Sequence, residues 1–432
     1  MNDSSQINVA LMGLGVVGGG VATALLEHSE DIFSKTGKSI HLKRILVRDT
    51  SKPRAVSIPA DMITSNPEDI LEDPTIQIVV EVMGGSNPAK QLLAGCLSHG
   101  KHVVTANKEV MAKYGPELQV LADKNKSRLL YEASVCAGIP IINSLCDPLL
   151  ANKIQNIRGI INGTSNYILT DMAQHQADFE DALKEAQELG YAEADPTNDV
   201  DGFDAVYKLS ILASLAFHYR VSPDDVYREG IRQLQAQDFQ YARELGYGIK
   251  SLAVADCKEG KIQARVYPAL IPLDNMIAKV DGVYNAVEVS GDLCGSVMLH
   301  GMGAGREPTT SAVIGDLIQL SRQIAVSGAT PLKPSQDMDL QIKPIDELET
   351  RYYIRLIVTD TAGVLAQIAK ILGANQISIA SVLQKDTFPD EQKAELVITT
   401  HPSREASVQE SLNDVANLGV VSEISNVIRI EE

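Results

Sequence analysis

The stretch INVALMGLGVVGGGVATALLE, residues 7–27, decides how the N-terminal part of the chain folds. The apolar run from Ile7 to Gly13 predicts a buried strand, and Val16 to Glu27 predicts a helix. Where the strand passes into the helix, three glycines have the spacing G-x-G-x-x-G, which in a βαβ unit allows a tight turn, a close approach to a pyrophosphate and close packing of helix on strand. The stretch therefore predicts a dinucleotide site, with a purely structural glycine turn as the alternative. Its residues are Gly13, Leu14, Gly15, Val16, Val17 and Gly18.

Further strand-like segments follow this unit as far as residue 145, and helix-like segments alternate with them. The strand-like segments are His41–Asp49, Ile76–Gly84, Lys101–Asn107 and Arg128–Ala133. Such alternation is typical of βαβ units. Residues 1–145 are therefore expected to form a nucleotide-binding domain, an α/β fold with a Rossmann-type doubly wound parallel sheet.

The end of the second strand, LVRDTSKPR, bears on the choice of coenzyme. NAD sites place an acid on the ribose hydroxyls there, whereas NADP sites place an arginine near the additional phosphate. Arg48 precedes Asp49, and Lys52 and Arg54 follow closely. We expect Arg48 and Lys52 to bind NADP(H). Use of NAD(H) as well stays open, as does the alternative that these are ordinary exposed basic residues.

Three more regions follow the first domain. Residues 146–305 combine amphipathic helices with strand-like runs, which predicts an α+β catalytic and dimerisation domain. Residues 306–326 predict a helix that packs back onto the first domain, and residues 327–350, with three prolines, predict a linker. Residues 351–432 have a βαββαβ pattern, typical of a ferredoxin-like module.

Composition excludes several classes of protein. The 432 residues carry a formal net charge of −18, which argues against binding to nucleic acid or to an anionic membrane. Five widely spaced cysteines suit a reducing cytoplasm better than a disulfide framework. The N-terminus is a poor signal peptide, and no apolar run is long enough to span a membrane. We therefore expect a cytoplasmic protein with no nucleic-acid or membrane partner.

An acidic segment, LGYAEADPTNDVDGFDAVYKLSIL at 189–212, carries five acids ahead of one lysine. It is not an EF-hand, because with Gly202 at loop position 6 the bidentate position 12 is Lys208. Asp204 and Lys208 are four residues apart, so one helix face presents both. The segment is either an acidic loop that caps a helix or a site for a cationic substrate.

Eight motifs complete a pattern that resembles homoserine dehydrogenase, in the monofunctional form with a C-terminal ACT domain and no fused aspartokinase. They are GLGVVG, MGG, TANKE, EASVCAGIPII, NGTSNYIL, GYAEADPTNDVDGFDAVYKL, GMGAGREPTTSAV and the C-terminal module. The resemblance covers nearly the whole chain. It implies reversible reduction of L-aspartate 4-semialdehyde to L-homoserine with a nicotinamide coenzyme, a step in threonine and methionine biosynthesis.

The resemblance also implies roles for individual residues. Lys208 is expected to exchange the proton with the carbonyl or alcohol oxygen, and Lys108 to lie at substrate and coenzyme. The substrate-binding residues are expected to be Glu193, Asp204, Asn162 and Thr164. Further coenzyme contacts are expected at Gly84, Thr105, Gly190 and Gly303. These roles suit the chemistry, because a cationic donor neutralises a developing alkoxide and carboxylates pair with an α-ammonium.

Two further sites are implied by the resemblance alone. A monovalent cation, Na⁺ or K⁺, is expected at Glu132, Val135, Ala137 and Ile139. The ACT module is expected to bind an amino-acid effector, threonine, at Asp360, Gly363, Asn375 and Ile377, although a purely structural dimerisation module is the alternative. A homodimer or homotetramer is expected.

Two rival hypotheses remain at this point. The first is a dehydrogenase that acts on a related amino acid or semialdehyde, which the size of the site around Glu193 to Lys208 would distinguish. The second is a sensor without catalytic activity that binds NADP(H) and an amino acid. The presence of both Lys108 and Lys208 argues against the sensor.

Overall fold

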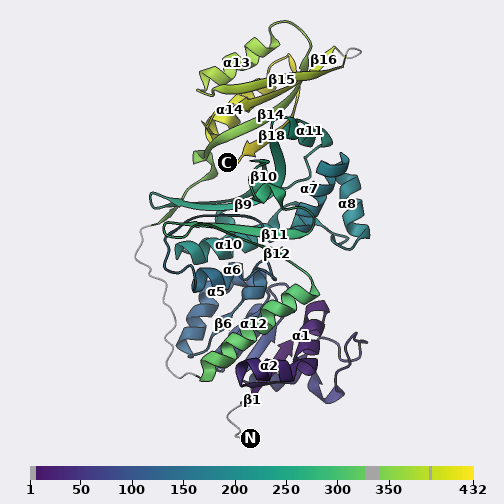
Figure 1. Ribbon diagram of the computed structural model, residues 1–432, viewed down its shortest axis with the longest axis vertical. Coiled ribbons are helices and arrows are strands. Elements are labelled where there is room, and N and C mark those ends of the chain that lie inside the picture. Colours follow the sequence, from purple (N-terminus) through teal and green to yellow (C-terminus); the bar gives the residue numbers. More distant parts are fainter. Residues whose placement is uncertain (1–5, 326–339, 389–391) are drawn as a thin grey trace. The chain divides into compact units, whose positions relative to one another are not determined.

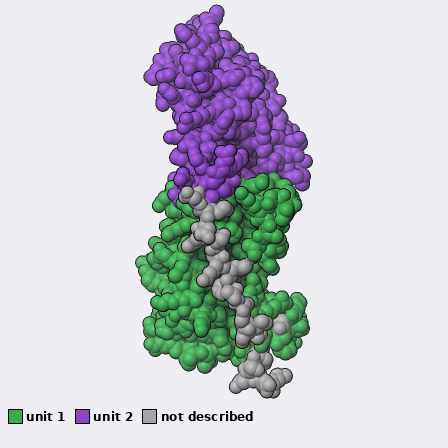
Figure 2. Space-filling model, turned by 90° about the vertical axis from the view of Figure 1, so that its left-hand side faces the viewer, with its two compact units in different colours: residues 1–155, 207–224, 287–338 green, residues 156–206, 225–286, 339–432 purple. Residues whose placement is uncertain are grey.

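The computed structural model describes residues 6–325, 340–388 and 392–432. The chain divides into two compact units, coloured separately in Figure 2. Unit 1 comprises residues 1–155, 207–224 and 287–338, and unit 2 comprises residues 156–206, 225–286 and 339–432. The linker predicted at 327–350 lies partly outside the described residues. Its described part, from residue 340 on, contains the short strand β13 (Gln341–Ile342), a 3₁₀ turn (Ile345–Glu347) and the start of β14.

Unit 1 contains a six-stranded sheet with the order β3-β2-β1-β4-β5-β6, in which every neighbouring pair is parallel. This order confirms the predicted doubly wound sheet. Its strands are β1 (Gln6–Met12), β2 (Ser39–Leu46), β3 (Ile63–Thr64), β4 (Ile78–Glu81), β5 (His102–Thr105) and β6 (Leu129–Leu130). The strand predicted at 128–133 is shorter than expected, because Glu132–Ser134 form a 3₁₀ turn.

Helices cover this sheet, and α12 lies beside α1 (Figure 1). Val313, Leu317 and Leu320 of α12 are completely buried and share one hydrophobic core with Val21 and Leu25 of α1. The helices of unit 1 are α1 (Val16–Glu27), α2 (Ser29–Thr36), α3 (Glu68–Leu71), α4 (Ala89–Ser98), α5 (Lys108–Lys124), α6 (Ile141–Cys146) and α12 (Arg306–Ala325). Strands β11 (Tyr284–Gly291) and β12 (Gly295–Met302) precede α12.

In unit 2, one sheet runs from residues 154–272 into the C-terminal module. Its strands have the order β7-β9-β10-β18-β14-β16-β15. The two parts join where β10 pairs in parallel with β18, Ala269 with Arg429 and Leu270 with Ile430. The strands are β7 (Ile154–Ile160), β9 (Tyr247–Lys258), β10 (Lys261–Pro272), β14 (Glu349–Thr359), β15 (Ile379–Phe388), β16 (Lys393–Thr400) and β18 (Val421–Ile430), with short strands β8 (Val226–Arg228) and β17 (Ser403–Arg404).

The helices of unit 2 pack against this sheet. Helices α13 (Val364–Ala374) and α14 (Glu405–Ala416) complete the predicted βαββαβ order of the C-terminal module, which is confirmed. The others are α7 (Gly163–His175), α8 (Phe179–Glu188), α9 (Thr197–Val200) and α11 (Ala236–Glu244). Helix α10 (Phe203–Phe217) begins in the residues of unit 2 and continues in those of unit 1.

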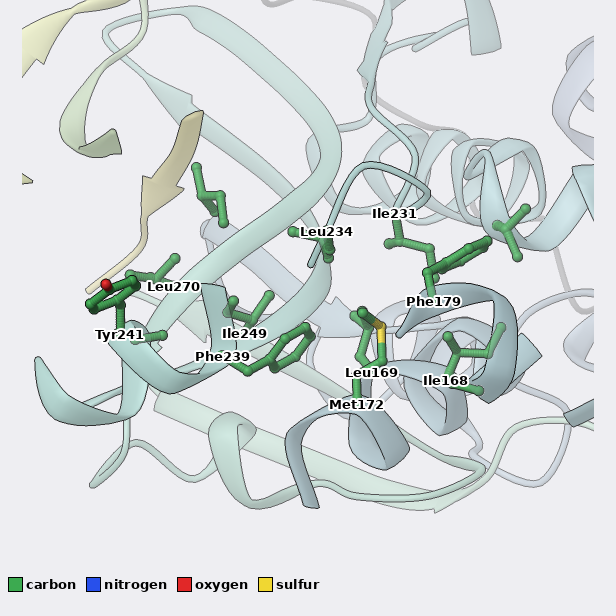
Figure 3. Packing of buried hydrophobic residues seen from close by; sticks show 14 of the residues in the cluster. Ile168, Leu169, Met172, Phe179, Ile231, Leu234, Phe239, Tyr241, Ile249 and Leu270 are labelled. Carbon is green, nitrogen blue, oxygen red and sulfur yellow. The ribbon is translucent and has the colours of Figure 1, made fainter. Parts of the chain in front are cut away.

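A hydrophobic core fixes α7, the helix that carries the NGTSN motif. Leu169 and Met172 of α7 lie on the side of Phe239 of α11 and Ile249 of β9, and Ile168 belongs to the same hydrophobic core (Figure 3). All five are buried. Burial of such a side chain contributes about 1.5–3 kcal/mol. The N-terminus of α7 is therefore held by a packed helix body.

Within the described ranges, no helix is long and apolar enough to cross a membrane.

Candidate active site

Because the loop is rich in glycine, few side-chain atoms cover the main-chain N–H groups at the start of α1. Gly13 has a positive φ of 102°, and a Cβ on Gly18 would lie 2.1 Å from the Gly13 carbonyl oxygen. A Cβ on Gly15, by contrast, would meet no described atom within 4 Å. Among the described residues, no side chain caps Gly15, and the first turn of α1 holds no acid. The first N–H groups of α1 therefore fit a phosphate group.

The loop after β2 places Arg54 nearest the glycine loop. Its Nη1 lies 3.4 Å from the Leu14 carbonyl oxygen, and its Nη2 donates to the Asp49 carbonyl oxygen. The Asp49 carboxylate accepts hydrogen bonds from the hydroxyl (2.6 Å) and the N–H (2.8 Å) of Ser51, which lower the pKa of Asp49. Arg48 and Lys52, the two predicted contacts, are exposed. Arg54 was noted among the basic residues of this segment but was not predicted as a contact, because its spacing in the sequence gives no sign that it reaches Leu14.

Lys108 is the first residue of α5 and follows a capped turn. The Asn107 side chain accepts a hydrogen bond from the N–H of Val110 (3.1 Å), and its Nδ2 donates to the Gly85 carbonyl oxygen (2.7 Å). Gly84 and Gly85 both have positive φ, 76° and 70°, and are exposed. The loop of Gly84 and the start of α5 therefore lie side by side at the carboxyl ends of β4 and β5, where such sheets bind ligands.

Helix α10 presents the acid and the lysine that the sequence singled out. Asp204 (3% exposed) and Lys208 (7% exposed) are one helical turn apart. Tyr207 precedes Lys208 in the chain. Within unit 1, the Lys113 ammonium of α5 lies 5.2 Å from the centre of the Tyr207 ring. The helices that carry Lys108 and Lys208 are therefore neighbours.

In unit 2, the Asn162 side chain joins two carboxylates. Its Nδ2 donates to Asp199 Oδ1 (2.7 Å) and to Asp204 Oδ2 (2.8 Å). Its Oδ1 accepts from the N–H of Ser165 (2.8 Å) and so caps α7, while the Ser165 hydroxyl donates to the Asp199 carbonyl oxygen (2.9 Å). We call Asn162, Asp199 and Asp204 the carboxylate cluster. Asp199 was not predicted, although it belongs to the same acidic segment.

The remaining residues of that segment are not equivalent to these. Glu193 is exposed, and Gly190, also exposed, has a positive φ of 77°. The Thr164 hydroxyl donates to the Tyr191 carbonyl oxygen (2.7 Å). Asp195 accepts from Thr197, which lowers its pKa, and Asp201 forms an ion pair with Arg232. The last two acids therefore shape the local chain.

The residues proposed for a cation lie in a buried turn. The Glu132 carboxylate accepts from the N–H groups of Ile142 (2.9 Å) and Asn143 (2.7 Å) at the start of α6. The Ile139 carbonyl oxygen accepts from the N–H of Ile141 (2.8 Å). Val135 and Ala137, which lie between Glu132 and Ile139 in the sequence, are also buried. Gly303, which was predicted as a coenzyme contact, is buried between β12 and α12. Within the described residues, no group of three or more His, Cys, Asp or Glu could hold a metal ion.

The residues proposed for an effector flank α13 of the C-terminal module. Gly363, with a positive φ of 92°, is the N-cap of α13, and Asn375 is its C-cap. Asp360 is exposed just after β14, and Ile377 is buried. All four residues therefore lie at the two ends of one helix.

Comparison with known proteins decides the family. Residues 140–318 match the family model for homoserine dehydrogenase, residues 13–132 that for the homoserine dehydrogenase NAD binding domain, and residues 352–427 that for the ACT domain. The chain belongs to the homoserine dehydrogenase family. It is 44% identical to the homoserine dehydrogenase of a Synechocystis species, over 98% of this chain and 99% of that one.

Solved structures agree with this assignment. A homoserine dehydrogenase from Thiobacillus denitrificans has a TM-score of 0.93 and 42% identity, covering 99% of this chain and 98% of that one. The enzyme from S. aureus has a TM-score of 0.78 and 34% identity, with 99% of both chains covered. A hyperthermophilic archaeal homoserine dehydrogenase mutant, solved in complex with NADPH, has a TM-score of 0.62 and 27% identity, covering 75% of this chain and 100% of that one. The chain is thus an oxidoreductase of this family with a nucleotide-binding domain and an ACT domain.

Proposed function

We propose that the protein interconverts L-aspartate 4-semialdehyde and L-homoserine, with NADP(H) as the preferred coenzyme. The observation that carries this proposal is the pairing on α10 of a buried acid, Asp204, with a buried lysine, Lys208. Asn162 fixes the acid by a hydrogen bond. An amino-acid aldehyde needs both groups, an anion for its ammonium and a proton donor for its carbonyl oxygen.

The reaction transfers one hydride and one proton. The nicotinamide ring, when bound, supplies the hydride to the aldehyde carbon or accepts it from the alcohol carbon. In reduction, Lys208 Nζ gives its proton to the carbonyl oxygen as negative charge develops there, and in oxidation it takes the alcohol proton. Lys108, at the start of α5, adds positive charge next to the coenzyme.

The carboxylate cluster is assigned to the substrate ammonium. Asp204 and Asp199 both accept from the single Asn162 amide, so the two carboxylates lie close to each other. Two neighbouring carboxylates concentrate negative charge, and a cationic ammonium suits such a cluster. Glu193 and Thr164 are proposed to close this side of the substrate.

The preference for NADP(H) rests on the loop after β2. The Asp49 carboxylate is engaged by Ser51, whereas an acid on the ribose hydroxyls is what NAD sites use. Arg48, Lys52 and Arg54 supply positive charge for the additional phosphate. NAD(H) is proposed as a weaker alternative. Gly190, Gly303 and Thr105 remain proposed coenzyme contacts.

The test is an assay of the purified protein with L-homoserine. We expect formation of reduced coenzyme with NADP⁺, and a lower kcat/KM with NAD⁺. A related amino alcohol, L-serine, is the control, because it is one carbon shorter and cannot place its hydroxyl and its ammonium in both positions at once. Turnover of L-serine at the rate of L-homoserine, or no turnover of L-homoserine at all, would reject the proposal.

Four further features are part of the proposal. Threonine is proposed to inhibit through Asp360, Gly363, Asn375 and Ile377, and L-threonine added to the same assay tests this. Na⁺ or K⁺ is proposed to bind the Glu132 carboxylate and the carbonyl oxygens of Val135, Ala137 and Ile139, since such hard cations prefer oxygen ligands. A homodimer or homotetramer is proposed. A cytoplasmic location is proposed because none of the five cysteines, all of which lie in the described residues, forms a disulfide.

A further inference from the structure

Glu81 is a buried carboxylate in the middle of the unit 1 sheet. It is the last residue of β4, and its exposed fraction is 0%. Strand β4 lies between β1, which leads into the glycine loop, and β5, which leads to Lys108. A buried carboxylate is unfavourable unless polar groups surround it. The contacts of Glu81 therefore show what it holds in place.

Two hydrogen bonds tie the carboxylate to loops on both sides. Oε1 accepts from the N–H of Met83 (2.7 Å), and Oε2 accepts from the Thr105 hydroxyl (2.6 Å). Burial raises the pKa of Glu81, and hydrogen bonds from Thr105, Met83, Asn107 and Gly84 oppose that rise. All these groups donate to Glu81, so the side chain acts purely as an acceptor.

The bonds continue beyond Thr105 and close a ring. The Thr105 oxygen accepts from the N–H of Asn107 (3.0 Å), and Asn107 Nδ2 donates to the Gly85 carbonyl oxygen (2.7 Å). Gly85 belongs to the loop that Glu81 also holds at Met83. The ring therefore joins the loop after β4, with its two exposed glycines, to the turn that begins α5 with Lys108.

The glycine loop rests on the same residues. A Cβ on Gly13 would lie 3.0 Å from the Val82 carbonyl oxygen and 3.1 Å from Met83 Cγ. Val82 and Met83 directly follow Glu81 in the chain. All three loops at this edge of the sheet thus depend on the geometry of the segment that Glu81 anchors.

We propose that Glu81 is a positioning residue for the coenzyme. Its carboxylate sets the loop of Met83 to Gly85 and, through Thr105 and Asn107, the start of α5 with Lys108. This inference rests on the proposed function, because it takes the coenzyme to bind at these loops. Glutamine has the shape of glutamate but carries no charge, and its Nε2 can only donate, so the Thr105 hydroxyl loses the charged acceptor to which it donates.

The test compares Glu81→Gln with a pair of variants at its partner, Thr105→Val and Thr105→Ser. The control is Glu117→Gln, an exposed carboxylate of α5 that faces Lys90. NADPH affinity is measured by coenzyme fluorescence without homoserine, together with kcat, the KM for homoserine and the melting temperature.

We expect Glu81→Gln to weaken NADPH binding and to lower kcat, each roughly tenfold, the effect of losing one hydrogen bond to a charged group. The KM for homoserine should stay within about twofold, since no atom of the carboxylate cluster changes. Thr105→Val should show the same pattern, and Thr105→Ser, which keeps the hydroxyl, should bind NADPH more tightly than Thr105→Val. Glu117→Gln should behave like the wild type.

Two results would overturn the proposal. One is a Glu81→Gln protein with wild-type NADPH affinity and kcat, whether or not its melting temperature falls. If Glu81→Gln does not fold, the Thr105 pair decides, and equal NADPH affinities for Thr105→Val and Thr105→Ser would be the contradicting result. Failure of the proposed function is distinct, because it would abolish turnover of homoserine by the wild type and leave these NADPH affinities measurable.

Discussion

The glycine loop of unit 1 acts through main-chain groups, whereas the carboxylate cluster of unit 2 acts through side chains. The loop offers main-chain N–H groups and empty space, since a Cβ on Gly15 would meet no described atom within 4 Å. The cluster offers side-chain charges that one amide, Asn162, holds at 2.7 and 2.8 Å. The loop is therefore sensitive to added volume, whereas the cluster is sensitive to changes of charge and of hydrogen-bond donor.

The largest effect that tests this contrast is expected from alanine in the glycine loop. Gly18→Ala should destabilise the free protein by about 3 kcal/mol or more, because the new Cβ meets the fixed Gly13 carbonyl group. Gly15→Ala should leave the free protein stable and weaken NADPH binding at least tenfold. Urea unfolding and coenzyme fluorescence measure the two effects. Equal stability of the two variants would break the steric account of the loop.

The next effect concerns the cluster. Asn162→Asp keeps the acceptor that caps α7 but removes the donor and adds a third negative charge. We expect the KM for homoserine to rise roughly thirtyfold, which corresponds to about 2 kcal/mol, with NADPH affinity unchanged. Asn198→Asp, at an exposed position of α9, is the matched control. A change in NADPH affinity as large as that in KM would show that the cluster does not act on the substrate alone.

A smaller effect is expected at Arg54. This residue sharpens the comparison of loop and cluster because it is a side chain that contacts the main chain of the glycine loop. Arg54→Gln should weaken NADPH binding roughly fivefold to tenfold and affect NADH little, since one charge-assisted contact is lost. Arg48→Gln, with no hydrogen bond to the loop in the structure's described residues, should have less effect. Dissociation constants for the four combinations check this, and a larger effect at Arg48 would contradict the geometry.

The smallest effect is expected at Asp73, whose charge contributes only to the stability of the fold. Burial acts to raise the pKa of Asp73, but hydrogen bonds from Lys43 and Thr75 lower it to about 2. Because the folded pKa lies below the unfolded one, this carboxylate stabilises the protein above about pH 4 and loses that effect as the pH falls toward 2. Asp73→Asn should cost about 1 kcal/mol at pH 6, a modest amount for a partly exposed pair. Urea unfolding at pH 6 and pH 3 should show a smaller pH dependence for the variant.

The sequence predicted local elements well where one pattern determined them. The glycine loop and the helix Val16–Glu27 follow from spacing and periodicity, and α1 has those bounds. The strand at Arg128–Ala133 was predicted too long, because the Glu132 N–H donates to Asp316 Oδ2 (2.9 Å) from α12, a contact 184 residues away. No local pattern could show that partner.

The candidate site divides in the same way. Asp204 and Lys208 were found because helical spacing places them on one face. Asp199, Arg54 and Glu81 were not predicted as site residues, because their importance comes from contacts between distant segments, such as Asn162 with Asp199 over 37 residues. A polar residue at the end of a buried strand, such as Glu81, was the one available signal, and it was read as part of the strand.

The central claim is that Lys208 transfers the proton, whereas the coenzyme is bound by other residues, those of the glycine loop. The most direct test is Lys208→Ala, studied by coenzyme fluorescence and by turnover of L-homoserine with NADP⁺. We predict that kcat falls by roughly 10³-fold, in the range for loss of a general acid–base group, while NADPH affinity stays within about threefold. A variant that keeps wild-type kcat would contradict the account.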